Sequence, residues 1–172
     1  MKKISYKKIL LTHDGSRLAS AAIPHIISIA VSYNSEVILV HVVESIEQEM
    51  IDLQSDDIAT SVGTVADVAQ EIVIAQKNKA KKILNQVRSK LEYNGVRTVK
   101  IRVSEGFADS KIVEIAKKEK CDLIVMSTHG RSGLGRALLG SVADFVLRHA
   151  LCPVLLVHPI KRRERFLANL FV

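Results

Sequence analysis

The chain has few aromatic residues and only two cysteines. Aromatic residues make up 4% of its 172 residues, and Trp is absent. The flat side chains on which single-strand binders stack nucleic-acid bases are therefore scarce, and we do not expect this kind of nucleic-acid binding. Cys121 and Cys152 are too far apart for a CxxC motif, so we expect two small buried side chains, no disulfide and no metal site.

Long apolar runs are also missing. No run of about 18 uncharged apolar residues is present to span a bilayer, and residues 1–8 (MKKISYKK) contain no apolar core of a signal peptide. We therefore expect a cytoplasmic protein with no membrane contact. With 48% apolar residues, residues 1–172 are enough for a single domain around one core.

Positive charge is missing from one stretch of a chain whose formal net charge is +7. No Lys or Arg occurs from Glu44 to Gln76, where eight side chains are acidic. We interpret residues 44–63 as an acidic insertion over one edge of the sheet or as a merely solvated loop. The rest of the chain is basic, and residues 159–172 form a basic tail. This basic surface is either simply solvated or attracts a polyanion.

Five short apolar runs alternate with longer helical patterns, which is typical of βαβ units and a parallel sheet. The predicted strands cover residues 8–12, 37–43, 98–103, 122–127 and 153–157. Four of these runs are almost continuously apolar, as in strands covered by helices on both faces. Residues 98–103 alternate instead, which predicts an edge strand.

Four helices are predicted between and after these strands. They cover residues 16–33, residues 64–94, a segment that starts at Asp109 or Ser110, and a segment from Gly140 to before Pro153. Ser16 is the predicted N-cap of the first helix, and Pro24 inside it predicts a kink. Gly95 is placed to end the second helix.

Two loops are candidates for a ligand site. If strands 8–12 and 122–127 flank the point where the strand order reverses, residues 12–16 and 127–141 meet at that point. The second loop holds four of the eight glycines and leads into a helix N-terminus. Free N–H groups and the helix dipole favour an anion there, so the sequence predicts a phosphate cradle.

Three better-known phosphate loops do not fit these letters. The spacing from Gly135 to Gly140 is that of a Walker A loop, but Ser141-Val142 follows in place of Lys and Ser or Thr. Residues 133–138 (GLGRAL) lack the last glycine of a dinucleotide fingerprint. The sequence Ser104-Glu105-Gly106 lacks the Asp of a phosphorylation receiver domain.

The same loop carries a family resemblance. Ser127-x2-Gly130-x9-Gly140-Ser141 matches the signature G-x2-G-x9-G-[ST], with Ser127 in place of the first glycine. The chain thereby resembles the universal stress proteins, over most of residues 6–158 and without the acidic insertion or the tail. The resemblance implies a doubly wound, five-stranded parallel sheet with strand order 3-2-1-4-5, which is flavodoxin-like and similar to adenine nucleotide alpha hydrolases.

The resemblance also implies ATP or AMP as the ligand, with Mg²⁺ or Mn²⁺ on the phosphates. Asp14 would lie near the ribose and the metal, and the main chain at Val42 would recognise adenine. The amides of Gly130, Gly140, Ser141 and Val142 would bind phosphate. The nucleotide-binding residues implied are Thr12, His13, Asp14, Val42, Ser127, Thr128, His129, Gly130, Arg131, Gly140, Ser141 and Val142.

We therefore expect a nucleotide-dependent switch or scaffold in a stress response. Catalysis would be slow ATP hydrolysis or autophosphorylation at most, because the two loops offer no evident acid–base pair and no Walker lysine. A homodimer through residues 153–158 is implied by the family, and the protein partner is unknown. The alternative is an interaction module that binds a protein or a nucleic acid through the basic surface, without a nucleotide.

Overall fold

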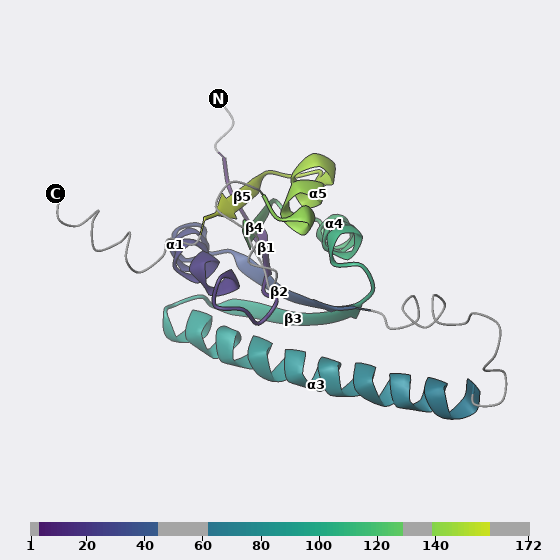
Figure 1. Cartoon of the computed structure of the whole chain (residues 1–172). Coiled ribbons are helices and arrows are strands. Elements are labelled where there is room, and N and C mark those ends of the chain that lie inside the picture. Colours follow the sequence, from purple (N-terminus) through teal and green to yellow (C-terminus); the bar gives the residue numbers. More distant parts are fainter. Residues whose placement is uncertain (1–3, 45–61, 129–138, 159–172) are drawn as a thin grey trace, which may run out of the picture.

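The computed structural model describes residues 4–44, 62–128 and 139–158, with the backbone alone for residues 62–68. Its centre is a five-stranded parallel sheet in the order β3-β2-β1-β4-β5 (Figure 1). The strands are β1 Lys8–Thr12, β2 Glu36–Val43, β3 Thr98–Glu105, β4 Leu123–Ser127 and β5 Val154–Val157. The predicted fold class and strand order are confirmed.

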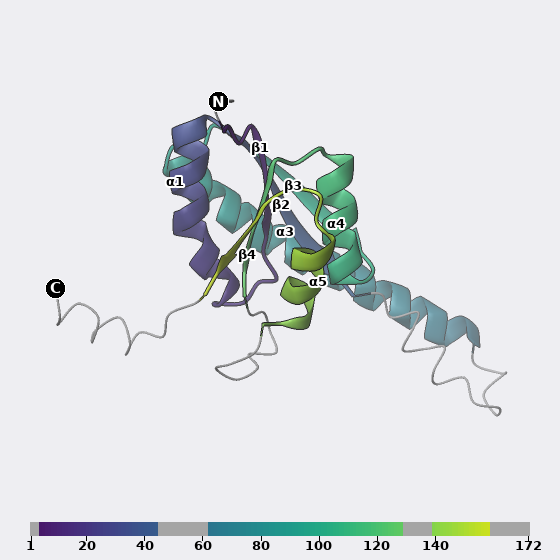
Figure 2. The ribbon, with the colours of Figure 1, turned by 90° about the horizontal axis from the view of Figure 1, so that it is seen from above.

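Helices cover both faces of this sheet (Figure 2). They are the 3-10 helix η1 Ala19–Ala22 and the α-helices α1 Ile23–Tyr33, α3 Val62–Tyr93, α4 Ala108–Lys118 and α5 Ser141–His149. β1 shows why its run is apolar throughout: Ile9 and Leu11 pack with α1 and α3, whereas Leu10 packs with α4 and α5. All three side chains are fully buried. β3 alternates in exposure along one edge of the sheet, as predicted.

The long helix α3 extends past the sheet that it covers (Figure 1). At 1.5 Å per residue its 32 residues span about 48 Å, whereas the eight residues of β3 span about 26 Å. Leu84 and Leu91 in its C-terminal half are fully buried, while Ile72 and Ile74 nearer its start are about half exposed. Gly95, with φ +92°, follows the helix and accepts the left-handed backbone, as predicted.

The first predicted helix is divided in two, and the predicted kink at Pro24 is wrong. Ser16 Oγ accepts the Ala19 N–H at 3.0 Å and so caps η1. The α-helix begins only at Ile23, which places Pro24 in its first turn. Because Pro24 has no N–H to give to the Ser20 carbonyl, that carbonyl accepts the N–H of Ile23 in a 3-10 turn. Proline therefore starts the α-helix and does not bend it.

Two predicted segments, residues 45–61 of the acidic insertion and the tail 159–172, lie outside the described residues. Within the described ranges, no helix combines the length and the apolar character needed to cross a membrane.

Candidate functional site

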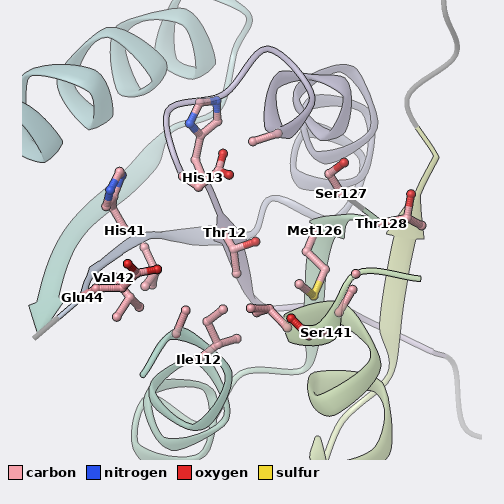
Figure 3. Close-up of a pocket in the computed structure, with 17 residues that line it drawn as sticks. Thr12, His13, His41, Val42, Glu44, Ile112, Met126, Ser127, Thr128 and Ser141 are labelled. Carbon is pink, nitrogen blue, oxygen red and sulfur yellow. The ribbon is translucent and has the colours of Figure 1, made fainter. Parts of the chain in front are cut away.

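A cavity of about 370 Å³ lies at the carboxyl ends of the strands (Figure 3). It is beside β1, which has β2 as its neighbour on one side and β4 on the other, so the strand order reverses there. This volume is within the range of small-molecule sites, about 300–1,000 Å³. The predicted site residues that line it are Thr12, His13, Asp14, Val42, Ser127, Thr128, Gly140, Ser141 and Val142. The other three, His129, Gly130 and Arg131, lie outside the described residues.

Several lining residues were not predicted from the sequence. They are Ala19, Val40, His41, Glu44, Ala108, Ile112, Met126 and Ala143. Val40 and Met126 lie in predicted strands next to predicted site residues, so strand geometry could have indicated them. Ala108 and Ile112 come from α4, which follows the edge strand, and no local motif places them at this cavity. The apolar side chains among them, such as Ile112 and Met126, form a wall of the kind that a planar base contacts.

The main chain of β2 turns polar groups toward this cavity at Val42. Peptide groups of successive strand residues point to opposite neighbours. Val40 points to β1, because its carbonyl accepts the His13 N–H at 2.9 Å, and Val43 points to β3, because its carbonyl accepts the Gly106 N–H at 3.0 Å. Val42 must therefore point to the β1 side, where β1 has already ended at Thr12. Its N–H and carbonyl can pair with the edge of a ligand ring.

The N-terminus of α5 supplies amide groups at the other side of the cavity. The N–H of Asp144 makes the first helical bond, to the Gly140 carbonyl at 2.9 Å. The N–H groups of Ser141, Val142 and Ala143 therefore lie outside the intrahelical ladder, and all three residues line the cavity. Such amides, with the helix dipole behind them, favour an anionic group.

The Gly140 amide makes a hydrogen bond within the protein, and its expected role as a phosphate donor stays a prediction. It donates to the Thr128 carbonyl at 3.0 Å, while the Thr128 N–H donates to the Val157 carbonyl at 3.0 Å. The Thr128 hydroxyl lies 3.2 Å from His158 Nδ1. Thr128 thus ties the start of α5 to the ends of β4 and β5, and the amides that lie outside these hydrogen bonds are those of the residues after Gly140.

The loop after β1 is fixed by two hydrogen bonds between residues two positions apart in the sequence. Gly15 N–H donates to His13 Nδ1 at 3.1 Å, and Ser16 N–H donates to Asp14 Oδ1 at 2.9 Å. Gly15 has φ +85°, and a Cβ there would lie 2.9 Å from Ile83 Cδ1. Glycine is therefore favoured at this turn by its backbone conformation, and a Cβ would also displace the end of the Ile83 side chain.

The described lining of the cavity carries little positive charge. Its ionisable lining residues in the described part of the chain are His13, Asp14, His41 and Glu44. Burial lowers the pKa of His13, and the opposing effect of Asp14 is smaller. No group of three acidic, His or Cys side chains that could hold a metal occurs among the described residues. Asp14 could contribute one ligand to a metal whose other ligands come from phosphates and water.

Ser127, which replaces the first glycine of the signature, is the last residue of β4 and is 8% exposed. It lines the cavity, and its side chain points away from Ser141 of α5 (Figure 3).

The two cysteines lie away from the cavity, near the amino ends of β4 and β5. Burial raises the pKa of the Cys121 thiol to about 12 and also raises the pKa of Cys152. Both thiols are free. The thiolate form needed for nucleophilic chemistry is therefore disfavoured at both positions.

Comparisons with known proteins agree with this architecture. Residues 5–158 match the family model described as Universal stress protein family. Universal stress protein MJ0531 of Methanocaldococcus jannaschii is 37% identical over 158 residues, which are 91% of this chain and 85% of that protein. The solved structure of MJ0577 from the same organism is 30% identical and has a TM-score of 0.76. The match covers 92% of this chain and 99% of that one.

A less similar solved structure contains a nucleotide. It is a universal stress protein family protein from Arabidopsis thaliana with AMP bound, which is 20% identical with a TM-score of 0.59. The alignment covers 92% of this chain and 94% of that one. At this identity the likeness shows a shared fold.

Proposed function

The chain belongs to the universal stress protein family, and we propose that it binds an adenine nucleotide, ATP or AMP, in the cavity beside β1. It acts in the cytoplasm as a nucleotide-dependent switch or scaffold in a stress response. The AMP complex of the Arabidopsis protein supports this class of ligand for the fold.

One observation carries the proposal: three different kinds of recognition group meet at one cavity. The Val42 peptide groups offer a donor and an acceptor to adenine, beside the apolar wall that includes Ile112 and Met126. The Asp14 carboxylate can accept from ribose hydroxyls or hold a metal. The amides that begin α5 can bind phosphate.

A divalent cation fits this arrangement as part of the nucleotide complex. The described lining has two carboxylates, Asp14 and Glu44, and no Lys or Arg. A triphosphate would meet little cationic charge from these residues alone. Mg²⁺ or Mn²⁺ held by Asp14 would offset the negative charge of these two carboxylates and fix the phosphates.

We propose that the nucleotide is a ligand and that chemical turnover is slow. Phosphoryl transfer needs a placed base and strong neutralisation of the transferred group. His13 is held by hydrogen bonds with the Gly15 amide and the Ser20 hydroxyl, and Asp14 is assigned to ribose or metal. Hydrolysis should therefore remain far below about 1 s⁻¹, a modest rate for an enzyme.

A charge substitution at Gly140 tests nucleotide binding. Gly140 is the N-cap of α5 with φ −61° and ψ 146°, a conformation that suits Asp and Asn, which are both good N-caps. Gly140→Asp should fold but abolish ATP binding in calorimetry, because its carboxylate faces the phosphate. Gly140→Asn has the same shape without the charge, and its oxygen can also cap these amides, so it should bind more weakly than the unsubstituted chain but more tightly than Gly140→Asp.

Equal binding by the Asp and Asn variants would contradict a phosphate at the start of α5. No ATP or AMP binding by the unsubstituted chain would favour the interaction module without nucleotide. A steep loss of nucleic-acid affinity with added salt would then identify a polyanion as its partner.

We also propose that the chain forms a homodimer through the outer edge of β5. β5 lies at the end of the sheet, and its carbonyl groups at Pro153 and Val157 accept hydrogen bonds from β4. The peptide groups of Val154 and Leu156 therefore point outward. Leu147 and Leu151 nearby are 48% and 78% exposed, so a second copy would cover both these outward peptide groups and apolar surface.

A further inference from the structure

One carboxylate of the cavity lies beside the main-chain groups that can pair with the edge of a ligand ring. Glu44 follows the last residue of β2 and lines the cavity together with Val42, two residues earlier. Figure 3 shows these two side chains next to each other, on the side of the cavity where Ile112 of α4 also lies. Glu44 therefore belongs to the part of the lining that the proposed function assigns to the base.

The register of β2 shows which face of the sheet Glu44 extends. Side chains two residues apart in a strand point to the same face. Val40 is buried in the cluster that includes residues of α4 and α5, and Val42 packs against this cluster. The Val43 carbonyl still accepts the Gly106 N–H at 3.0 Å, so the strand pairing is regular up to this point. Glu44 thus continues the row of Val40 and Val42 on the face that α4 and α5 cover.

The other ionisable side chains of the described lining have different surroundings. His13 and Asp14 each accept an amide hydrogen bond within the loop after β1. His41 alternates with Val42 along β2 and lies on the opposite face, toward α3. In the described part of the lining, Glu44 is therefore the one ionisable side chain that adjoins the apolar wall on the α4 side.

Glu44 has no cation to neutralise it within the described part of the chain. Most of the described glutamates form an ion pair with Lys or Arg, namely Glu36, Glu92, Glu105, Glu114 and Glu119. Glu44 and the exposed Glu71 of α3 do not. A ligand that fills the cavity removes water from the Glu44 carboxylate. Such a ligand is accepted only where it presents a hydrogen-bond donor to this carboxylate.

The edge of a purine decides whether that donor is present. Adenine carries an amino group with two N–H donors at position 6, whereas hypoxanthine carries a carbonyl oxygen there. The Val42 carbonyl can accept one amino proton, which leaves the second for Glu44. An ionised carboxylate offers acceptors only. A carbonyl oxygen at position 6 would therefore face the carboxylate with no proton between them.

We propose that Glu44 is a specificity-determining residue that accepts the second proton of the 6-amino group, so that the cavity takes 6-aminopurine nucleotides and rejects 6-oxopurine nucleotides. This inference rests on the proposed function and deepens it. The apolar wall and the amides of α5 do not distinguish these two classes of base. The peptide groups of Val42 do contribute to the choice, so the test has to separate the side chain of Glu44 from the main chain.

The variant Glu44→Gln, measured with ATP and with ITP, makes this separation. The two nucleotides have the same ribose and phosphates, and their bases differ at position 6 and at the neighbouring N1. Gln has the length of Glu but offers both a donor and an acceptor, so it can pair with either base. Calorimetry in the presence of Mg²⁺ gives the ratio of the affinities for ATP and ITP. The lost negative charge affects both nucleotides alike and cancels in this ratio.

The wild type should prefer ATP, and Glu44→Gln should lower this preference about tenfold, the effect of one hydrogen bond to a charged group. Glu71→Gln is the matched control, because it makes the same change at an exposed glutamate outside the cavity lining. It should keep the wild-type ratio. An equal ratio in Glu44→Gln and the wild type overturns the inference and leaves nucleotide binding in place. So does a wild type that binds ATP and ITP equally.

The ribose is the other part of the nucleotide that could donate to Glu44, and 2′-deoxy-ATP examines it. If the carboxylate accepts from the 2′-hydroxyl, Glu44→Gln changes the ratio of ATP to 2′-deoxy-ATP and leaves the ratio of ATP to ITP as in the wild type. That result also overturns the inference. Failure of the wild type to bind any of the three nucleotides would overturn the proposed function, and this inference with it.

Discussion

The amide of Gly140 donates a hydrogen bond to the Thr128 carbonyl across 3.0 Å, so the two ends of the glycine-rich loop are joined directly. Thr128 is fixed in turn by the Val157 carbonyl and lies beside His158 at the end of β5. The site and the proposed dimer edge are therefore connected through one residue. A change in the position of α5 on ligand binding would reach β5 through Thr128, which gives a switch a physical route.

Proline at position 140 tests what the Gly140 amide does. The observed φ of −61° suits proline, but the proline Cδ takes the place of an N–H that is bonded to the Thr128 carbonyl at 3.0 Å and so displaces that carbonyl. The lost hydrogen bond costs about 1 kcal/mol, and the displaced carbonyl outweighs the gain from a stiffer unfolded chain. The unfolding free energy in urea should therefore fall by more than about 1 kcal/mol, and ATP should still bind to the folded variant within a few-fold of wild type. A complete loss of binding would assign to the amide the role of phosphate donor.

Divalent cations should increase the affinity for ATP and leave the affinity for adenosine unchanged. The reason is the pair of carboxylates, Asp14 and Glu44, in a described lining without Lys or Arg. Asp14→Asn should remove most of the increase, because it takes away the metal ligand and keeps the shape. Calorimetry with Mg²⁺ and with a chelator measures this. An equal increase in Asp14→Asn and in the wild type would place the metal elsewhere.

The apolar runs made the fold predictable, since residues such as Ile9, Leu10 and Leu11 must be covered on both faces of the sheet. Much of the cavity was predictable because the loops at the carboxyl ends of neighbouring parallel strands meet at one edge of the sheet. The role of Pro24 was missed because the letters show a helix-compatible run and not the 3-10 turn that precedes it. Ala108 and Ile112 were missed because their approach to the cavity is a property of helix packing.

The unfolding free energy should fall on acidification through the histidine range. Burial lowers the pKa of His13 in the folded chain below its ordinary value near 6.5. Below about pH 6.5 the unfolded chain binds more protons than the folded chain, so stability is lost as the pH falls toward the folded pKa and no further below it. Urea titrations of wild type and His13→Asn should show a shallower pH dependence in the variant. Parallel curves would mean that His13 does not contribute.

Restoring the signature glycine should strengthen phosphate binding at a small cost in stability. Ser127→Gly removes a Cβ from the cavity wall, and glycine in a strand costs about 0.5–1 kcal/mol. ATP should bind more tightly by a few-fold, while adenosine, which has no phosphate, should bind as before. Calorimetry with both ligands separates the two effects. Weaker ATP binding would instead show that the serine hydroxyl contacts the phosphate.

A single proline tests the dimer at β5. The N–H of Leu156 points away from β4, because the neighbouring Val157 carbonyl accepts from Thr128. Leu156→Pro therefore removes an outward donor and leaves the ladder with β4 complete, as prolines on edge strands do. Light scattering should find a monomer.

Leu156→Ala is the matched control for this test, because it loses the apolar side chain but keeps the outward N–H. It should remain dimeric at the same concentration. The pairing is then attributable to the main chain of β5, in the way that an unpaired edge recruits a second strand. A dimer that survives Leu156→Pro must use another surface, and the exposed side chains of Leu147 and Leu151 would be the next to change.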